Sequence, residues 1–132
     1  MGWAHNIHHT RRVHLFAFTF LGKKPHILHE LDLRTVDKQT CDDFHEINKP
    51  TDYDPPLYHK GIFCAGGEAG KDACGGDSGS AVLTKNFSEQ KVVQVGLVSG
   101  SLIVGECGLK DAYGYYTRVA YYLKWILDNM SD

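Results

Sequence analysis

Alternating apolar and polar positions predict a series of short strands along the chain. Between residues 27 and 36, Leu31 and Leu33 recur at a period of two, so their side chains face the same way on a strand. Within residues 13–21 the alternation is of another kind, and we favour a strand there as well. Leu15, Ala17, Thr19 and Leu21 alternate with Phe16, Phe18 and Phe20. Further strands are expected at residues 61–65, 81–84, 92–99 and 115–119, with a polar hairpin connection at residues 85–91.

Two helices complete the predicted elements. Asp37 can cap a short helix from residue 38 to about residue 45, because its side-chain oxygen accepts hydrogen bonds from N–H groups of the first turn. Residues 46–60 contain three prolines and are expected to form a loop. Near the carboxyl end, apolar residues recur at helical spacing, and we interpret this stripe as core packing. Its members are Val119, Tyr122, Leu123, Ile126, Leu127 and Met130.

The length and net charge of the chain restrict the classes of protein to which it can belong. The chain has 132 residues and a mass of 14.8 kDa, enough for one domain with a modest core. Its net charge of -2 gives no indication of a nucleic-acid partner. Arg11 and Arg12 precede the apolar run 13–21 in the manner of a secretory signal, but no small-x-small cleavage site follows. The run is also too short to span a membrane.

Histidines near the amino terminus raise the question of a metal site. They are His5, His8, His9 and His14. Imidazole nitrogens bind zinc, but no cysteine or carboxylate shares the spacing of these residues, and histidines in loops are usually solvated. We therefore expect no metal site, and nothing else in the sequence points to a cofactor.

One glycine-rich stretch concentrates groups suited to nucleophilic catalysis. It is the serine loop, residues 70–80, with Ser78 as the candidate nucleophile. A serine hydroxyl attacks a carbonyl only if a base removes its proton and donors stabilise the resulting oxyanion. Glycine lets the backbone turn sharply and point successive N–H groups into one concavity, and the glycines here are Gly75, Gly76 and Gly79. Beside the nucleophile, Asp77 needs a partner charge if it is buried.

The serine loop, with its flanking segments, resembles the active-site loop of the trypsin/chymotrypsin family of serine endopeptidases. Residues 72–79 carry the likeness most strongly, and residues 28–130 fit the C-terminal half of the family in order. The supporting segments are Ile62-Phe63-Cys64-Ala65-Gly66, Gly96-Leu97-Val98-Ser99, Cys107-Gly108, Tyr115-Tyr116-Thr117-Arg118-Val119 and Trp125-Ile126.

This resemblance implies a fold. It is all-β, the second six-stranded antiparallel barrel of the trypsin-like two-barrel fold, followed by a C-terminal helix. Residues 27–132 would form that barrel, as part of a protease domain, and residues 1–26 an irregular extension or insertion at its start.

The resemblance also assigns roles within a site that cleaves a protein or peptide substrate. Ser78 would attack the peptide carbonyl, and the N–H groups of Gly76 and Ser78 would form the oxyanion hole. Asp72 resembles the aspartate at the base of the primary specificity pocket, which implies cleavage after Arg or Lys. Gly114 resembles the small residue that keeps this pocket open. Ser99 and Gly100 resemble the strand that pairs with substrate, and Asp77 is expected to have a structural role.

Four cysteines permit three pairings, and the sequence alone does not choose among them. The resemblance implies the disulfides Cys41–Cys64 and Cys74–Cys107. Disulfides form in oxidising compartments, so we expect a secreted, extracellular protein.

The family's general base and its orienting aspartate belong to the first barrel, where the histidine stands in an Ala-Ala-His-Cys-like segment. None of this chain's eight histidines stands in such a context. We therefore expect a partial domain that is inactive alone, needs the N-terminal barrel as a partner, and exposes an apolar face where that barrel would pack.

Two alternatives stay open. One is a non-catalytic protease homologue that acts as a binding or regulatory module. The other is a different serine hydrolase whose base is one of the local histidines.

Overall fold

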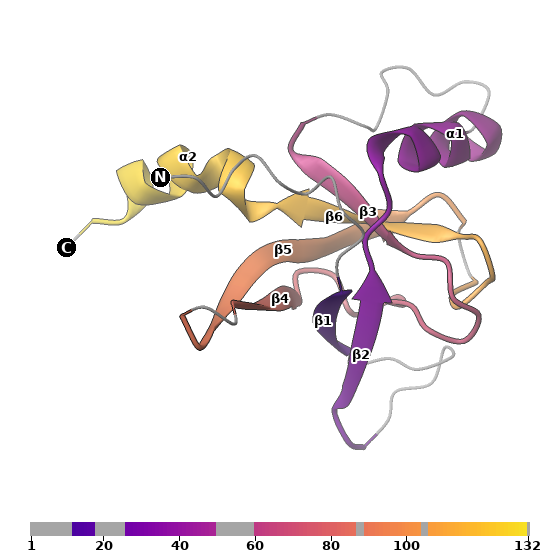
Figure 1. Cartoon of the computed structure of the whole chain (residues 1–132), viewed down its shortest axis with the longest axis horizontal. Coiled ribbons are helices and arrows are strands. Elements are labelled where there is room, and N and C mark those ends of the chain that lie inside the picture. Colours follow the sequence, from indigo (N-terminus) through magenta and orange to yellow (C-terminus); the bar gives the residue numbers. More distant parts are fainter. Residues whose placement is uncertain (1–11, 18–25, 50–59, 87–88, 104–105, 132) are drawn as a thin grey trace.

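The computed structural model describes residues 12–17, 26–49, 60–86, 89–103 and 106–131. Strands dominate these residues, and two helical segments flank them (Figure 1). The strands are β1 (Arg12–Ala17), β2 (His29–Arg34), β3 (Ile62–Gly66), β4 (Ala81–Asn86), β5 (Lys91–Ser101) and β6 (Tyr113–Arg118). The helices are α1 (Lys38–Asn48), the 3₁₀ turn η1 (Val119–Tyr122) and α2 (Leu123–Asn129).

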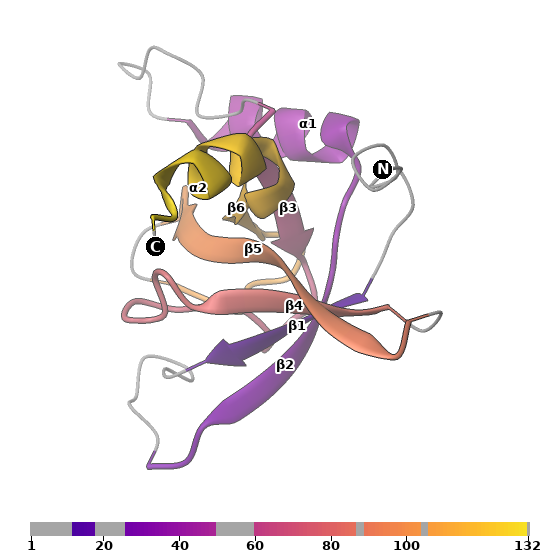
Figure 2. The same ribbon diagram turned by 90° about the vertical axis from the view of Figure 1, so that its left-hand side faces the viewer.

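The six described strands form one antiparallel sheet in the order β2-β1-β4-β5-β6-β3. Figure 2 shows how this sheet curls from β2 through β4 and β5 toward β3. Its two outer strands meet where Thr35 bridges Ala65 and the Val36 N–H donates to the Cys64 carbonyl at 3.0 Å. The expected fold class, a six-stranded antiparallel barrel with a C-terminal helix, is therefore confirmed.

The core lies inside the curl of the sheet. On β1 and β2, Val13 pairs with Leu33 and Leu15 pairs with Leu31, and all four side chains are buried. Alternate residues of a strand point to opposite faces, so this register sends the polar residues between them outward. Phe63, Val82, Val98 and Tyr116 complete the buried interior from the other strands.

Strand β1 lies within a stretch for which two predictions were made. The alternation of residues 13–21 predicted a strand, and a strand is present at Arg12–Ala17, while residues 18–21 lie outside the described part. Residues 1–26 were also expected to be an irregular extension. Six of them nevertheless belong to the sheet, because β1 pairs with β2 on one side and β4 on the other.

Helix α1 begins at Lys38, and Asp37 is its N-cap as predicted. The Asp37 Oδ1 accepts a hydrogen bond from the Thr40 N–H at 2.7 Å, and this bond lowers the pKa of the Asp37 carboxyl. The helix continues to Asn48, three residues beyond the expected end. Cys41 and Phe44 are buried on one face, which holds the helix against the barrel.

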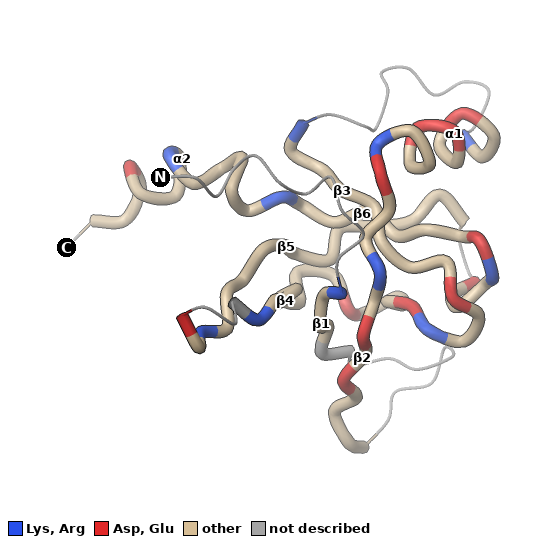
Figure 3. Tube along the Cα trace, viewed as in Figure 1, with Lys and Arg blue, Asp and Glu red and all other residues tan. Residues whose placement is uncertain are grey.

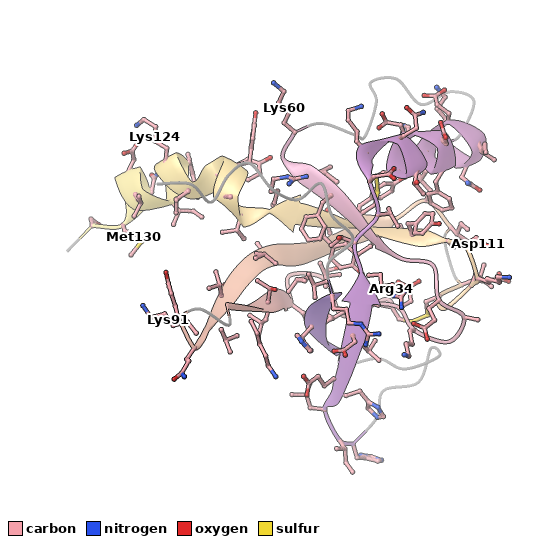
Figure 4. The ribbon with its side chains drawn as sticks, viewed as in Figure 1. Arg34, Lys60, Lys91, Asp111, Lys124 and Met130 are labelled. Atoms are coloured by element: carbon pink, nitrogen blue, oxygen red, sulfur yellow. A yellow bond between two sulfur atoms is a disulfide. The ribbon has the colours of Figure 1, made fainter. Side chains whose placement is uncertain are left out.

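The apolar stripe of the last helix was predicted to be core packing. Within the described residues this was wrong for Leu123, Leu127 and Met130, whereas Val119, Tyr122 and Ile126 are half-buried. Neither η1 nor α2 has a buried residue, and Leu123, Leu127 and Met130 are 49%, 60% and 70% exposed. Figure 4 labels Lys124 on α2 and Met130 directly after the end of α2, both away from the strands. The spacing correctly indicated a helix, but a stripe identifies a buried face only if some surface covers it. None of the described helices is long and apolar enough to cross a membrane.

Candidate active site

The serine loop leaves β3 and returns to the sheet through a tight turn around Asp77. The Asp77 N–H donates to the Cys74 carbonyl at 3.0 Å, and the Cys74 N–H donates to Asp77 Oδ2 at 2.8 Å. The Ser80 N–H in turn donates to the Asp77 carbonyl at 3.0 Å. The Asp77 side chain is fully buried at 0% exposure, whereas the adjacent Ser78 is exposed. The buried carboxylate thus anchors a turn that presents the serine to solvent.

Two glycines give this turn its shape. Gly76 and Gly79 have φ angles of 102° and 83°, in the region that residues with a Cβ rarely adopt. Within the described part of the chain, the N–H groups of Gly76 and Ser78 donate to no acceptor. Two unused donors therefore flank the exposed hydroxyl group, which is the chemical requirement of an oxyanion site.

The exit of the loop is fixed on strand β5. The Gly79 N–H donates to the Val98 carbonyl at 2.9 Å, and the Val98 N–H donates to the Ser80 carbonyl at 3.0 Å. Beyond this point β4 no longer runs beside β5, because their pairing ends at Ala81 and Leu97. Ser99 and Gly100 are exposed there, while β6 pairs with the other edge of β5. An open backbone edge thus lies next to the serine loop.

The entry of the loop is clamped to residues 107–111. The Gly70 N–H donates to the Gly108 carbonyl at 2.7 Å, and the Asp111 N–H donates to the Gly67 carbonyl at 3.0 Å. The disulfide Cys74–Cys107 crosses the same junction, with its Cα atoms 5.6 Å apart. The other disulfide, Cys41–Cys64, joins α1 to β3. Both expected pairings are confirmed.

Asp72 lies within this clamped region. Its Oδ2 accepts the Gly108 N–H at 3.1 Å, and its side chain is half-buried. Burial is the main cause that raises the pKa of the Asp72 carboxyl, and the nearby charge of Asp77 raises it further, against the hydrogen bond from Gly108. A carboxylate in such a position gains from a cationic partner, because the partner offsets the cost of burying its charge.

Tyr116 is a residue of this region that the sequence analysis did not assign to the site. It is fully buried and stacks on Phe63 with ring centroids 5.4 Å apart. Burial, and next the charges of Asp72 and Asp77, raise the pKa of its phenol. Among the described residues its hydroxyl has no hydrogen-bond partner. In the sequence, Tyr116 is one aromatic residue of an expected strand, and such residues more often belong to the core than to a functional site.

Gly114 accommodates the Tyr116 ring. A Cβ at Gly114 would lie 3.1 Å from both Cε2 and the hydroxyl oxygen of Tyr116, closer than ordinary van der Waals contact. Gly114 was expected to keep a pocket open. In the structure, the hydroxyl end of Tyr116 lies in the space beside Gly114.

Among the described residues, no histidine is hydrogen-bonded to the serine. Of the described histidines, His14 contacts Asp32 and Glu30 on the outer face of β1 and β2, and the buried His45 lies 3.4 Å from the Tyr115 hydroxyl. No hydrogen bond joins Ser78 to a histidine within the described ranges, while His5, His8, His9 and His59 lie outside them. The arrangement therefore holds a nucleophile, two N–H donors and a partly buried carboxylate.

An exposed serine on a glycine turn, set on a six-stranded antiparallel barrel with these two disulfides, defines the class of the trypsin-like serine proteases. The family model described as Trypsin matches residues 16–126. The chain belongs to this family.

Several curated proteins are similar to most of the chain. Human mannan-binding lectin serine protease 1 is 36% identical over 109 residues, which are 81% of this chain and 14% of that protein. The clotting factor G beta subunit of Tachypleus tridentatus is 33% identical over 111 residues, 79% of this chain and 33% of that protein. Phenoloxidase-activating factor 2 of Galleria mellonella is 31% identical over 111 residues, 83% of this chain and 35% of that protein. The chain thus spans 14% to 35% of the length of these relatives.

Proposed function

We propose that this barrel supplies the nucleophile, the oxyanion hole and the specificity pocket of a serine endopeptidase that cleaves after Arg or Lys. One observation carries the proposal. Ser78 is exposed on a turn anchored by the buried Asp77, between two N–H groups that have no acceptor among the described residues. A merely structural turn would have no need to leave both donors unused.

The chemistry follows from that arrangement. Ser78 Oγ bonds to the substrate's carbonyl carbon as a base takes its proton, and the carbonyl π electrons move to the oxygen. The N–H groups of Gly76 and Ser78 stabilise this oxyanion, each by roughly 3 kcal/mol in related enzymes. Collapse of the intermediate breaks the C–N bond and releases the amine, which takes up the proton. Water then repeats the cycle and frees the acid.

Asp72 supports the preference for basic residues. Its half-buried carboxylate has a pKa raised by burial, so a guanidinium or ammonium group beside it would offset an existing electrostatic cost. The unpartnered hydroxyl of Tyr116 adds a polar group in the same neighbourhood. A neutral side chain would leave both groups without compensation, and this difference would favour Arg and Lys.

The open edge of β5 supports binding of an extended peptide. Ser99 and Gly100 lie where β4 no longer pairs with β5, directly beyond the hydrogen bonds that fix the serine loop. A substrate strand could add to this edge through backbone hydrogen bonds and reach Ser78.

The base and orienting aspartate would come from the family's first barrel. The exposed apolar residues of α2 and η1 support this part, since a surface of this kind is normally covered. They are Tyr121, Leu123, Trp125, Leu127 and Met130. Without the other triad members, turnover in this family falls by roughly 10⁴ to 10⁶. The chain by itself would therefore be inactive, and its disulfides favour a secreted protein.

A non-catalytic homologue that binds substrates or partners is the second candidate. It is favoured by the lack of hydrogen bonds between Ser78 and any histidine in the described ranges. This candidate predicts the same fold, so only a probe of the pocket and of serine reactivity separates it from the first.

Binding of a fluorescent amidine, 4-aminobenzamidine, tests the pocket without needing the triad. We expect the chain to enhance its fluorescence, Asp72→Asn to abolish the gain, and Asp42→Asn on α1 to leave it unchanged. An intact fold that does not bind the amidine would contradict the proposed preference for Arg and Lys.

A fluorophosphonate reagent tests the nucleophile. Weak labelling that disappears in Ser78→Ala is the expected result for a serine without its base. Strong labelling that is lost when one of the chain's own histidines is replaced would instead identify a local base and contradict the proposal.

A further inference from the structure

Three metal-binding side chain types come together on the outer face of β1 and β2. His14 lies directly opposite Asp32 in the strand register, and Glu30 lies two residues from Asp32 on the same face. His14 Nδ1 is 2.5 Å from Asp32 Oδ1 and 3.4 Å from Glu30 Oε1. The three ligand atoms all lie within 4.8 Å of one another. Figure 3 shows the acidic positions along β2 beside β1.

The hydrophobic register holds these groups on one face. Val13, Leu15, Leu31 and Leu33 are the alternate residues of the same two strands, and all are buried. A slip by one residue would expose these four side chains and bury the polar ones, so the core fixes the outward direction of His14, Asp32 and Glu30. The ligand atoms are therefore positioned by a strand pair whose other face is buried in the core.

The donor set and its spacing suit zinc. Zinc bonds to imidazole nitrogen and carboxylate oxygen at about 2.0–2.2 Å, which in a tetrahedral arrangement places donors roughly 3.3–3.5 Å apart. The separation of His14 Nδ1 from Glu30 Oε1 matches, and the Asp32 carboxylate has to rotate away by about 1 Å. Magnesium and calcium prefer sites made only of oxygen ligands, so the histidine favours zinc over them.

We propose that His14, Glu30 and Asp32 form a zinc-binding site that joins β1 to β2. Three protein ligands leave the fourth position to water. The Glu30 and Asp32 side chains are 58% and 41% exposed, so an ion can enter past their carboxylates, whereas the His14 Nδ1 atom itself is buried. Arg12 Nη1 lies 3.8 Å from the other oxygen, Oδ2, of Asp32. Arg12 thereby orients this carboxylate while leaving Oδ1 for the metal, although its charge lowers the affinity.

Calorimetric titration with Zn²⁺ of the oxidised chain, expressed without a polyhistidine tag, tests the proposal. We expect one equivalent of Zn²⁺ to bind, and His14→Ala or Asp32→Asn to weaken binding at least about tenfold. Glu30→Gln, at an exposed position, should weaken it without loss of the fold. Replacement of the bound ion by Co²⁺ should give visible absorption bands that the His14→Ala variant lacks.

The amino-terminal histidines provide the matched control. A variant with His5, His8 and His9 all changed to alanine should keep the site's stoichiometry and affinity. Binding that is lost in this triple variant but kept in His14→Ala would overturn the proposal. So would the lack of stoichiometric uptake together with a stability loss in metal-free Asp32→Asn, since the three residues would then be an ion-pair cluster only.

Discussion

Adding one methyl group at Gly96 tests how tightly the barrel packs beneath the candidate site. A Cβ built there would lie 2.7 and 2.8 Å from Cε1 and Cζ of Phe63 and 3.1 Å from the Thr117 carbonyl oxygen. Carbon atoms in favourable contact are about 3.5–4.0 Å apart, so the Phe63 ring has to move by nearly 1 Å. The ring is only 4% exposed and stacks on the fully buried Tyr116, so little space is available for that movement.

The expected cost of Gly96→Ala follows from this crowding. Overpacking of a rigid core costs about 1–3 kcal/mol, and the lower entropy of the unfolded alanine chain returns about 0.4–1 kcal/mol. We therefore expect the free energy of unfolding to fall by up to about 2.6 kcal/mol, with a decrease in Tm of up to roughly 10 °C. Urea titration of the oxidised chain, followed by circular dichroism, measures the loss.

Gly100→Ala on the same strand is the control. Gly100 has no heavy atom within 4 Å of its built Cβ, so the substitution adds no crowding and only the effect on the unfolded chain remains. Its stability should stay equal to the parent chain or rise by up to about 1 kcal/mol. Equal stabilities of Gly96→Ala and Gly100→Ala would refute the claim that the Phe63 ring is fixed by its neighbours.

Three further variants probe the disulfide Cys41–Cys64, the buried phenol of Tyr116 and the half-buried carboxylate of Asp72. Changing Cys41 and Cys64 together to alanine removes a disulfide between residues 23 apart in sequence, and the free energy of unfolding should fall by about 3 kcal/mol. Equal urea midpoints of the variant and the parent chain, both measured without reductant, would contradict this. Tyr116→Phe removes a buried hydroxyl that has no hydrogen-bond partner among the described residues, so the free energy of unfolding should be unchanged or rise by up to about 1 kcal/mol. A clear decrease in Tm would instead show that this hydroxyl makes a hydrogen bond. Burial raises the pKa of Asp72 above 3.8, so the folded chain holds this proton more tightly than the unfolded chain, and ionisation lowers stability as the pH rises through the folded pKa. Asp72→Asn should therefore be more stable than the parent at pH 7 and lose this advantage in titrations below about pH 4; an advantage independent of pH would rule out the burial argument.

Local sequence patterns predicted the elements well because their causes are local. The alternation of Leu31 and Leu33 produced β2, and the Asp37 side chain caps α1 where expected. The apolar stripe on the last helix led to a wrong prediction, because helical spacing indicates which face is apolar but not whether a neighbouring element covers that face. The exposure of Leu127 and Met130 depends on surfaces that lie beyond this helix.

The residues of the candidate site likewise fall into those that a local sequence motif predicts and those that only the fold brings together. Ser78 and the glycines that shape its turn are adjacent in sequence, so a short motif identified them. Tyr116 reaches the neighbourhood of Asp72 only through the pairing of β6 with β5 and β3, which no spacing in the sequence encodes. The carboxylates beside His14 were missed for the same reason, since the strand register supplies them from residues 16 and 18 positions further along the chain.

The junction between β2 and β3 has a consequence for how the molecule opens. Among the described residues, the bridge between Thr35 and Ala65 and the hydrogen bond from Val36 to Cys64 close the curl there, whereas the ladders between β4 and β5 and between β5 and β6 are longer. The disulfide from Cys41 to Cys64 links the two sides of this junction between β2 and β3, because α1, which carries Cys41, follows directly after β2. In a reducing compartment the sheet would unroll first at this junction, while the ladder between β4 and β5 would still be closed. Hydrogen exchange at the Val36 amide would therefore report the redox state of the surroundings before the rest of the barrel responds.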